Sequence, residues 1–208
     1  MAEWFRNDAW DADIAARFEA RLAKARNRSQ YLTIQAYCLL ATQPEVATTL
    51  ARRAIVLDDP TQTARAGLYL GTGLAMTGAV DAATEALEGA IEAQARHPAF
   101  RTAAHLDQAL LIAAVEREDL YPRAWVRLAE ERAVPAAERS PAALIAIILI
   151  GNAMGEHVAA DARNAIEILA EGAGVMTGPD CLSAKALTER LMAIAARSPS
   201  SATGIATI

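Results

Sequence analysis

Apolar residues recur at intervals of three and four through most of this chain, the spacing that places side chains on one side of an α-helix. The clearest example is the segment 64–98, where two such runs are separated by Gly78 and closed by His97-Pro98. Glycine and proline commonly end helices at such positions. The segment therefore predicts two short helices that pack antiparallel through their small and large apolar residues.

Within this segment the residue types follow a definite order, with Leu70-Gly71 in the first helix, Gly78 at the turn, and Ala83 and Leu87 in the second helix. This order resembles the tetratricopeptide repeat (TPR). The resemblance implies neighbouring pairs, because one pair of helices cannot bury its apolar face alone. We therefore expect an all-α protein, a right-handed α-α superhelix built as a TPR-like solenoid of about four to five antiparallel helix pairs.

Three further helix pairs are predicted around this segment, at 29–42 with 44–57, at 101–118 with 122–132, and at 141–154 with 157–171. The domain organisation then has four parts: an N-terminal aromatic segment and flanking helix (1–27), TPR-like helical repeats (28–174), a C-terminal capping helix (179–197) and a mobile tail (198–208). The capping helix is expected to cover the open end of the stack.

The composition agrees with a helical protein. Hydrophobic residues make up 53% of the 208 positions, which is ample for a core, and the abundance of alanine favours helix over strand. The net charge is −5, and the 20 Lys and Arg residues are interspersed with acids along the sequence. Nucleic acid is therefore not an expected partner.

Two features of the sequence bear on the compartment. The two cysteines give no disulfide framework, and the acidic N-terminus lacks the basic start and apolar core of a secretory signal. The uncharged run 141–154 is shorter than the roughly 20 residues needed to span a membrane, so we interpret it as a buried core helix. We expect a cytoplasmic protein that does not contact membranes.

Candidate chemistry is sparse. His157 and Asp161 stand four residues apart in a predicted helix and could supply two metal ligands, but a closed structural site takes four, so a hydrogen-bonded surface pair is the preferred interpretation. The glycine-rich stretches 71–73 and 172–178 do not follow predicted strands, as a dinucleotide-binding loop would. We expect neither catalysis nor a cofactor nor a metal.

The resemblance implies a concave groove lined by one stripe of each first helix. That stripe would include Leu32 and Ala36, and the residues expected to contact a partner are Leu39, Arg65, Leu68, Thr72, Met76 and Glu116. The stripe is mostly apolar and lacks the Lys, Arg and Asn set with which some members of the family hold a peptide carboxylate. A protein-interaction module that binds a peptide or helix on this face is the leading hypothesis.

Several alternatives remain open. The protein's own first or last helix could fill the groove, or two copies could meet there as a structural homodimer. In a third alternative, the groove closes into an apolar pocket for a small molecule, edged by Arg65, Glu116 and Asn152.

The N-terminal segment is unusually aromatic, with Trp4, Phe5 and Trp10 in a chain that is only 5% aromatic. One interpretation is a plug whose rings pack under the first helix, while Arg6 and Asn7 bond the backbone. The other makes Trp4 and Arg6 a secondary binding patch, since Trp and Arg often anchor interfaces. The segment also looks like the opening of small bacterial TPR-like proteins of unsettled role.

Overall fold

The computed structural model describes residues 3–171 and 182–197. All regular structure in these residues is helical, which confirms the prediction of an all-α chain. The α-helices are α1 (Ala12–Leu22), α2 (Arg28–Leu39), α3 (Pro44–Val56), α4 (Thr63–Met76), α5 (Val80–Arg96), α6 (Ala104–Ala114), α7 (Tyr121–Arg127), α8 (Ala129–Ala133), α9 (Pro141–Ala153), α10 (Ala159–Ala170) and α11 (Ala184–Ala195). Short 3-10 turns occupy Glu118–Leu120 and Ala136–Glu138.

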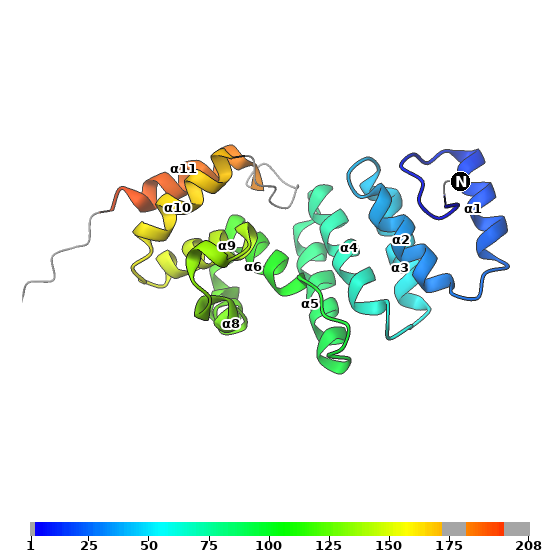
Figure 1. Ribbon diagram of the computed structural model, residues 1–208, viewed down its shortest axis with the longest axis horizontal. Helices are drawn as coiled ribbons and strands as arrows, with labels where there is room; N and C mark the ends of the chain where they lie inside the picture. Colours follow the sequence, from blue (N-terminus) through cyan, green and yellow to red (C-terminus); the bar gives the residue numbers. More distant parts are fainter. Residues whose placement is uncertain (1–2, 172–181, 198–208) are drawn as a thin grey trace, which may run out of the picture.

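The helices follow one another in space in nearly the order of the sequence. Helices α2 to α5 stand side by side as two antiparallel pairs, with α1 at the outer edge of this row and α10 with α11 at the opposite end (Figure 1). Each pair packs along its length, and α4 also contacts α2 and α6. This packing of neighbouring helices is consistent with a helical repeat.

The turn predicted at Gly78 is present and has a defined geometry. Gly78 has a φ of 79°, its N–H donates to the carbonyl of Ala75, and the N–H of Ala79 donates to that of Leu74. This is the Schellman arrangement, in which a left-handed residue ends a helix. The same arrangement ends α6 at Glu116 (φ 59°) and α9 at Gly155 (φ 85°). Three helices that each open a predicted pair therefore end in the same way.

Glycines let α4 approach its neighbours closely on two sides. A Cβ added to Gly67 would lie 2.9 Å from the Cβ of Ala90 in α5, and one added to Gly73 would lie 2.8 Å from Cγ2 of Thr48 in α3. Side chains at these positions would push the helices apart. Helix α4 is therefore held tightly between α3 and α5.

Two apolar cores meet at α4. The N-terminal core is built by α1 to α4 around Phe18 and Leu50, and the second core extends from α4 to α11 around Leu110 and Ile148. Leu70 packs against both. The central residues of α9 are buried, as expected for a core helix. Every helix in residues 3–171 and 182–197 falls short of the length and apolar character that a membrane span requires.

Several predicted boundaries need correction. The helix predicted over 122–132 is broken at Leu128 into α7 and α8, and the one predicted over 101–118 ends at Ala114, because Glu116 adopts a left-handed backbone. The last helix begins at Ala184, where the Ser183 hydroxyl accepts a bond from the N–H of Ala186 and caps the helix. The glycine-rich stretch 172–178, the start of the predicted capping helix and the tail 198–208 lie outside the described residues.

Candidate functional site

The prediction that Leu32, Ala36 and Leu39 of α2 line an open groove is wrong. Leu32, Ala36 and Leu39 are buried in the N-terminal core, and the side chain of Leu39 is 0% exposed. Tyr37 of the same helix, in contrast, has 58% of its surface open to solvent. Because each residue turns an α-helix by about 100°, a small error in register exchanges the buried and the open side. Leu39 therefore belongs to the core and is not available to a partner.

The four predicted positions on α4 are accessible to different degrees. Arg65 is exposed, whereas Leu68, Thr72 and Met76 are half-buried. The hydroxyl of Thr72 donates to the carbonyl of Leu68 at 2.9 Å. Their spacing places all four along one side of the helix.

Two tyrosines join this strip to α2. The rings of Tyr37 and Tyr69 lie 5.2 Å apart between centroids, at an interplanar angle of 38°. Burial raises the pKa of the Tyr69 hydroxyl, and the nearby cation of Arg65 opposes that shift. We define the α2–α4 face as Tyr37, Arg65, Leu68, Tyr69, Thr72 and Met76. Sequence reasoning missed both tyrosines, although each lies in the first helix of consecutive pairs in an aromatic-poor chain.

Glu116 lies apart from this face, in the turn after α6. It borders a cavity of about 460 Å³ together with Asn152, as the small-molecule alternative required, but Arg65 does not line that cavity. Arg190 donates to the carbonyls of Ala113 and Ala114 at the end of α6, and Arg197 donates to Asn152 at 3.0 Å. Both arginines of the cavity are therefore engaged in holding helices together.

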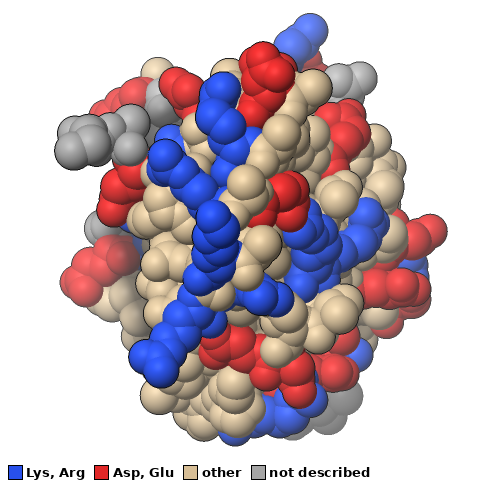
Figure 2. All heavy atoms as spheres, turned by 90° about the vertical axis from the view of Figure 1, so that its right-hand side faces the viewer, with Lys and Arg blue, Asp and Glu red and all other residues tan. Residues whose placement is uncertain are grey.

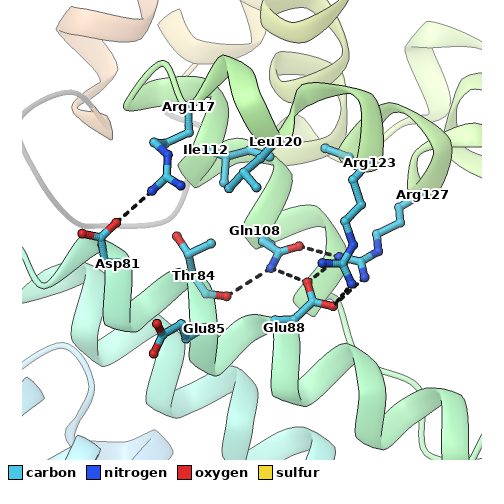
Figure 3. A pocket seen from close by; sticks show the side chains of 11 residues that line it. Asp81, Thr84, Glu85, Glu88, Gln108, Ile112, Arg117, Leu120, Arg123 and Arg127 are labelled. Atoms are coloured by element: carbon cyan, nitrogen blue, oxygen red, sulfur yellow. Dashed lines mark hydrogen bonds and ion pairs between the residues drawn. The ribbon is translucent and has the colours of Figure 1, made fainter.

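A second, more highly charged cleft separates α5 from α6 and α7 (Figure 3). Its volume is about 410 Å³. Asp81, Glu85 and Glu88 of α5 form one wall. The other wall carries the arginines of α7 and of the turn before it, Arg117, Arg123 and Arg127. Apolar side chains of Ile112, Leu120 and Ala124 also line the cleft. Arg117 crosses the cleft to Asp81 at 2.9 Å and also pairs with Asp119.

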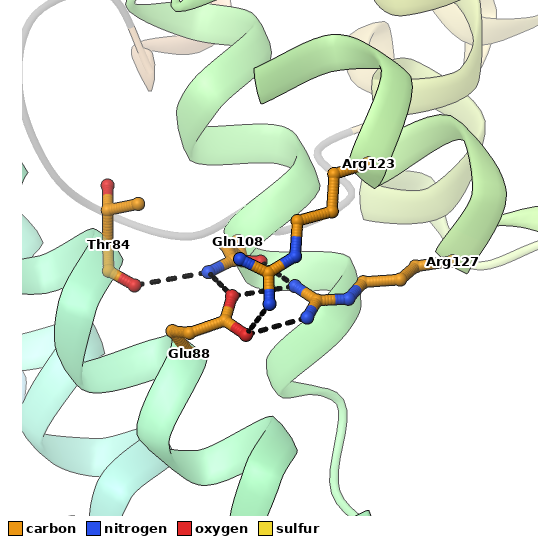
Figure 4. Close-up of polar contacts among 5 residues, drawn as sticks. All are labelled: Thr84, Glu88, Gln108, Arg123 and Arg127. Carbon is orange, nitrogen blue, oxygen red and sulfur yellow. Dashed lines mark hydrogen bonds and ion pairs between the residues drawn. The ribbon is translucent and has the colours of Figure 1, made fainter. Parts of the chain in front are cut away.

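Glu88 is the centre of a hydrogen-bond network in this cleft (Figure 4). Arg127 donates to both carboxylate oxygens of Glu88, at 2.7 and 2.6 Å, and Arg123 donates to one of them. The amide of Gln108 donates to Glu88 and to the carbonyl of Thr84, both at 3.1 Å, and its oxygen accepts from Arg127 at 2.9 Å. The network joins α5, α6 and α7.

These partners determine the chemistry of Glu88. The hydrogen bond from Arg127, opposed by burial and assisted by Gln108 and Arg123, lowers the pKa of Glu88 to about 2. A carboxylate this acidic is a poor general base at neutral pH. The network therefore acts as a structural clamp between three helices.

The structure does not bring His157 and Asp161 together as a pair. Helix α10 begins at Ala159, so His157 lies outside the helix and the four-residue spacing does not place it on the same side as Asp161. Asp161 instead lies 3.5 Å from Arg139. Over the described residues, no group of three or more His, Cys, Asp or Glu side chains is arranged to hold a metal ion.

The N-terminal aromatic residues pack against α1 and α2. The ring of Trp4 lies 5.4 Å from Phe18 and 4.9 Å from Tyr31 between centroids. The backbone N–H of Asn7 donates to Oε1 of Gln35, and Nε2 of Gln35 donates to the carbonyl of Asn7. These contacts favour the plug interpretation for Trp4. Arg6 is exposed and paired with Glu3, and its role in binding stays a prediction.

Comparison of the chain with protein-family models, curated proteins and solved structures found no match. The resemblance to tetratricopeptide repeats therefore stays a prediction, and any function has to be argued from the surfaces described above.

Proposed function

We propose that this protein is a non-catalytic helical scaffold that binds a polypeptide segment of a partner protein on the α2–α4 face. The observation that carries this proposal is the exposure of Tyr37, whose ring contacts that of Tyr69 in a tilted arrangement. Tyrosine and arginine are enriched among the residues that dominate binding energy at protein interfaces. Arg65 supplies the cation next to this aromatic pair.

The rigidity of the two helices supports the same function. Association costs free energy for every side chain and loop that it orders, so a pre-formed surface binds more tightly than a mobile one. The glycines of α4 place that helix in direct contact with α3 and α5, and the network at Glu88 ties α5 to α6 and α7. A partner would therefore meet Tyr69 on a helix that is already held in place.

The chemistry of the face indicates the kind of segment that it fits. Leu68 and Met76 offer apolar contact, while the Tyr37 hydroxyl, the Tyr69 hydroxyl and Arg65 offer hydrogen bonds. A peptide or helix with apolar side chains flanked by carbonyl or carboxylate oxygens matches this combination.

We further propose that the helix pairs form the right-handed TPR-like superhelix that the sequence resembles. The contacts of α4 with both α2 and α6 support this arrangement, because first helices of consecutive repeats are neighbours in such a stack. The shared turn geometry at residues 78, 116 and 155 gives further support.

Site-specific photo-crosslinking tests the binding face. A benzophenone amino acid replaces Tyr37 in one variant and Val126 in a matched control; Val126 of α7 is 73% exposed and lies outside the α2–α4 face. After irradiation in the native host, the Tyr37 position should give a crosslinked protein that the Val126 position does not give. Identical products at both positions would contradict the proposal, and a crosslink between two copies of the chain would favour the homodimer.

A ligand screen tests the small-molecule alternative separately. A compound that fills the cavity at Glu116 and Asn152 at 100 times its dissociation constant should raise the stability by about 2.7 kcal/mol. If Asn152→Ala abolishes this rise in stability and Tyr37 gives no crosslinked partner, the protein would be a small-molecule-binding protein and not a scaffold.

A further inference from the structure

Basic side chains gather on α1 to α3, at one end of the molecule. Residues 12–57 contain seven Lys and Arg against three Asp and Glu, a net charge of +4, while the acids Asp11, Asp58 and Asp59 directly flank this stretch. Figure 2 shows this end, where Lys and Arg side chains run across the surface in a nearly continuous stripe. The exposed Lys and Arg residues within 12–57 are Arg17, Arg21, Lys24, Arg26, Arg28 and Arg52.

A partly apolar groove lies within this basic surface. It has a volume of about 510 Å³ and is lined by residues of α1, α2 and α3. Leu22 and Leu32, which are buried, line it together with Val56 and Leu57, which are 82% and 46% exposed. We name this site the N-terminal groove. The exposed apolar pair at the end of α3 is unusual for a surface that is otherwise charged.

Two of the three arginines that line the groove have hydrogen-bond partners within the protein. Arg53 donates to both carboxylate oxygens of Glu19, at 2.6 and 2.9 Å, and so ties α3 to α1. Arg28 donates to the carbonyl of Ala23 after α1. Arg52 makes no hydrogen bond or ion pair within residues 3–171 and 182–197. The groove thus has a fixed wall with an unneutralised cation at its edge.

We propose that the N-terminal groove binds an acidic amphipathic segment of a partner protein. Apolar side chains of that segment would cover Val56 and Leu57, and its carboxylates would pair with Arg52 and the neighbouring cations of the basic surface. A nucleic acid backbone would use the cations but leave the apolar pair exposed, so an acidic polypeptide matches the groove better. The proposal does not depend on the α2–α4 face.

Fluorescence anisotropy with a labelled model peptide tests this proposal on the full chain. The probe is an amphipathic helical peptide of about five turns with leucine along one face and glutamate along the other. Its control has lysine in place of glutamate. The glutamate peptide should bind and the lysine peptide should not, and binding should weaken at about 300 mM salt, where exposed charges are screened.

Matched variants distinguish binding in the N-terminal groove from binding through the overall charge of the protein. Arg52→Glu should weaken binding by about five-fold and Val56→Ser by about ten-fold, since each removes a contact made only in the groove. The controls are Arg96→Glu, an exposed arginine in the last turn of α5, and Val126→Ser on α7, and both should change affinity by less than about two-fold. Circular dichroism confirms that each variant is folded.

Four outcomes would overturn the proposal. If Val56→Ser binds the peptide as tightly as the unmodified protein does, the apolar groove is not the binding site. If a peptide of the same composition in scrambled order binds equally well, the attraction is due to charge alone. Tighter binding of duplex DNA with the same loss in Arg52→Glu would identify a nucleic acid site. A dimer that Val56→Ser dissociates in light scattering would identify a second copy as the occupant. Tyr37→Ala should leave peptide binding intact, so this test and that of the α2–α4 face can fail independently.

Discussion

Gly67 and Gly89 are both interior glycines of helices, yet alanine should have opposite effects at the two positions. An alanine Cβ at Gly67 would lie 2.9 Å from the Cβ, 3.2 Å from the Cα and 3.3 Å from the nitrogen of Ala90. None of these atoms can rotate away, so α4 and α5 would have to separate. At Gly89 an added Cβ meets nothing within 4 Å.

The magnitudes follow from two competing contributions. Alanine in place of a helical glycine stabilises by about 0.5–1 kcal/mol, whereas forcing an extra carbon into a packed interface costs about 1–3 kcal/mol. Gly67→Ala should therefore destabilise by about 1 kcal/mol on balance and by at most about 2.5 kcal/mol, and Gly89→Ala should stabilise by roughly 0.5–1 kcal/mol. For a chain of this length each kcal/mol moves the melting temperature by about 2–4 °C.

Thermal unfolding followed by circular dichroism at 222 nm measures both variants beside the unmodified protein. A melting temperature for Gly67→Ala equal to or above that of Gly89→Ala would refute the close packing of α4 on α5. A lower value for Gly67→Ala with a higher value for Gly89→Ala supports it.

Three further predictions concern charge and burial. The lowered pKa of Glu88 stabilises the fold fully above its ordinary pKa of 4.5, and that contribution is lost as the pH falls towards 2. Glu88→Gln should therefore cost about 1–3 kcal/mol in urea denaturation at pH 7 and roughly half of that at pH 3, and an equal cost at both pH values would be inconsistent with the network. Burial raises the pKa of Asp107 to about 6, so its ionisation costs stability as the pH rises from 4 to 6. In calorimetry, Asp107→Asn should therefore raise the melting temperature at pH 7 but not at pH 4. A rise in melting temperature at pH 4 but not at pH 7 would contradict this. Leu39→Ala should destabilise by about 2–5 kcal/mol and Leu57→Ala by less than about 1 kcal/mol in chemical denaturation, and similar values would mean that Leu39 is not in the core.

The sequence predicted the elements best where local signals were strong. Pro44 opens a helix and Gly78 ends one because each favours a backbone geometry that few other residues adopt without cost. The third pair was predicted less well, since nothing around Leu128 marks the break between α7 and α8. The left-handed turn at Glu116 was missed for a similar reason, because glutamate is rarely found in that conformation.

The surfaces were harder to predict because they depend on which neighbours a helix has. Apolar residues lie on several sides of α2, so the sequence does not show that Leu39 faces the core and Tyr37 faces outward. The basic surface was missed because the packing of α2 on α3 brings Arg28 close to Arg52 and Arg53, which are distant in the sequence. Glu88 and Arg127 likewise meet only in the folded chain.

The affinity of the partner captured at Tyr37 tests the central claim most directly. Isothermal titration calorimetry would compare the unmodified protein, Tyr37→Ala and the matched exposed control Val126→Ala. We expect Tyr37→Ala to weaken binding by about 2 kcal/mol, roughly thirty-fold, and Val126→Ala to leave it within a factor of about two. Equal affinities for all three proteins would contradict the assignment of the α2–α4 face as the binding surface.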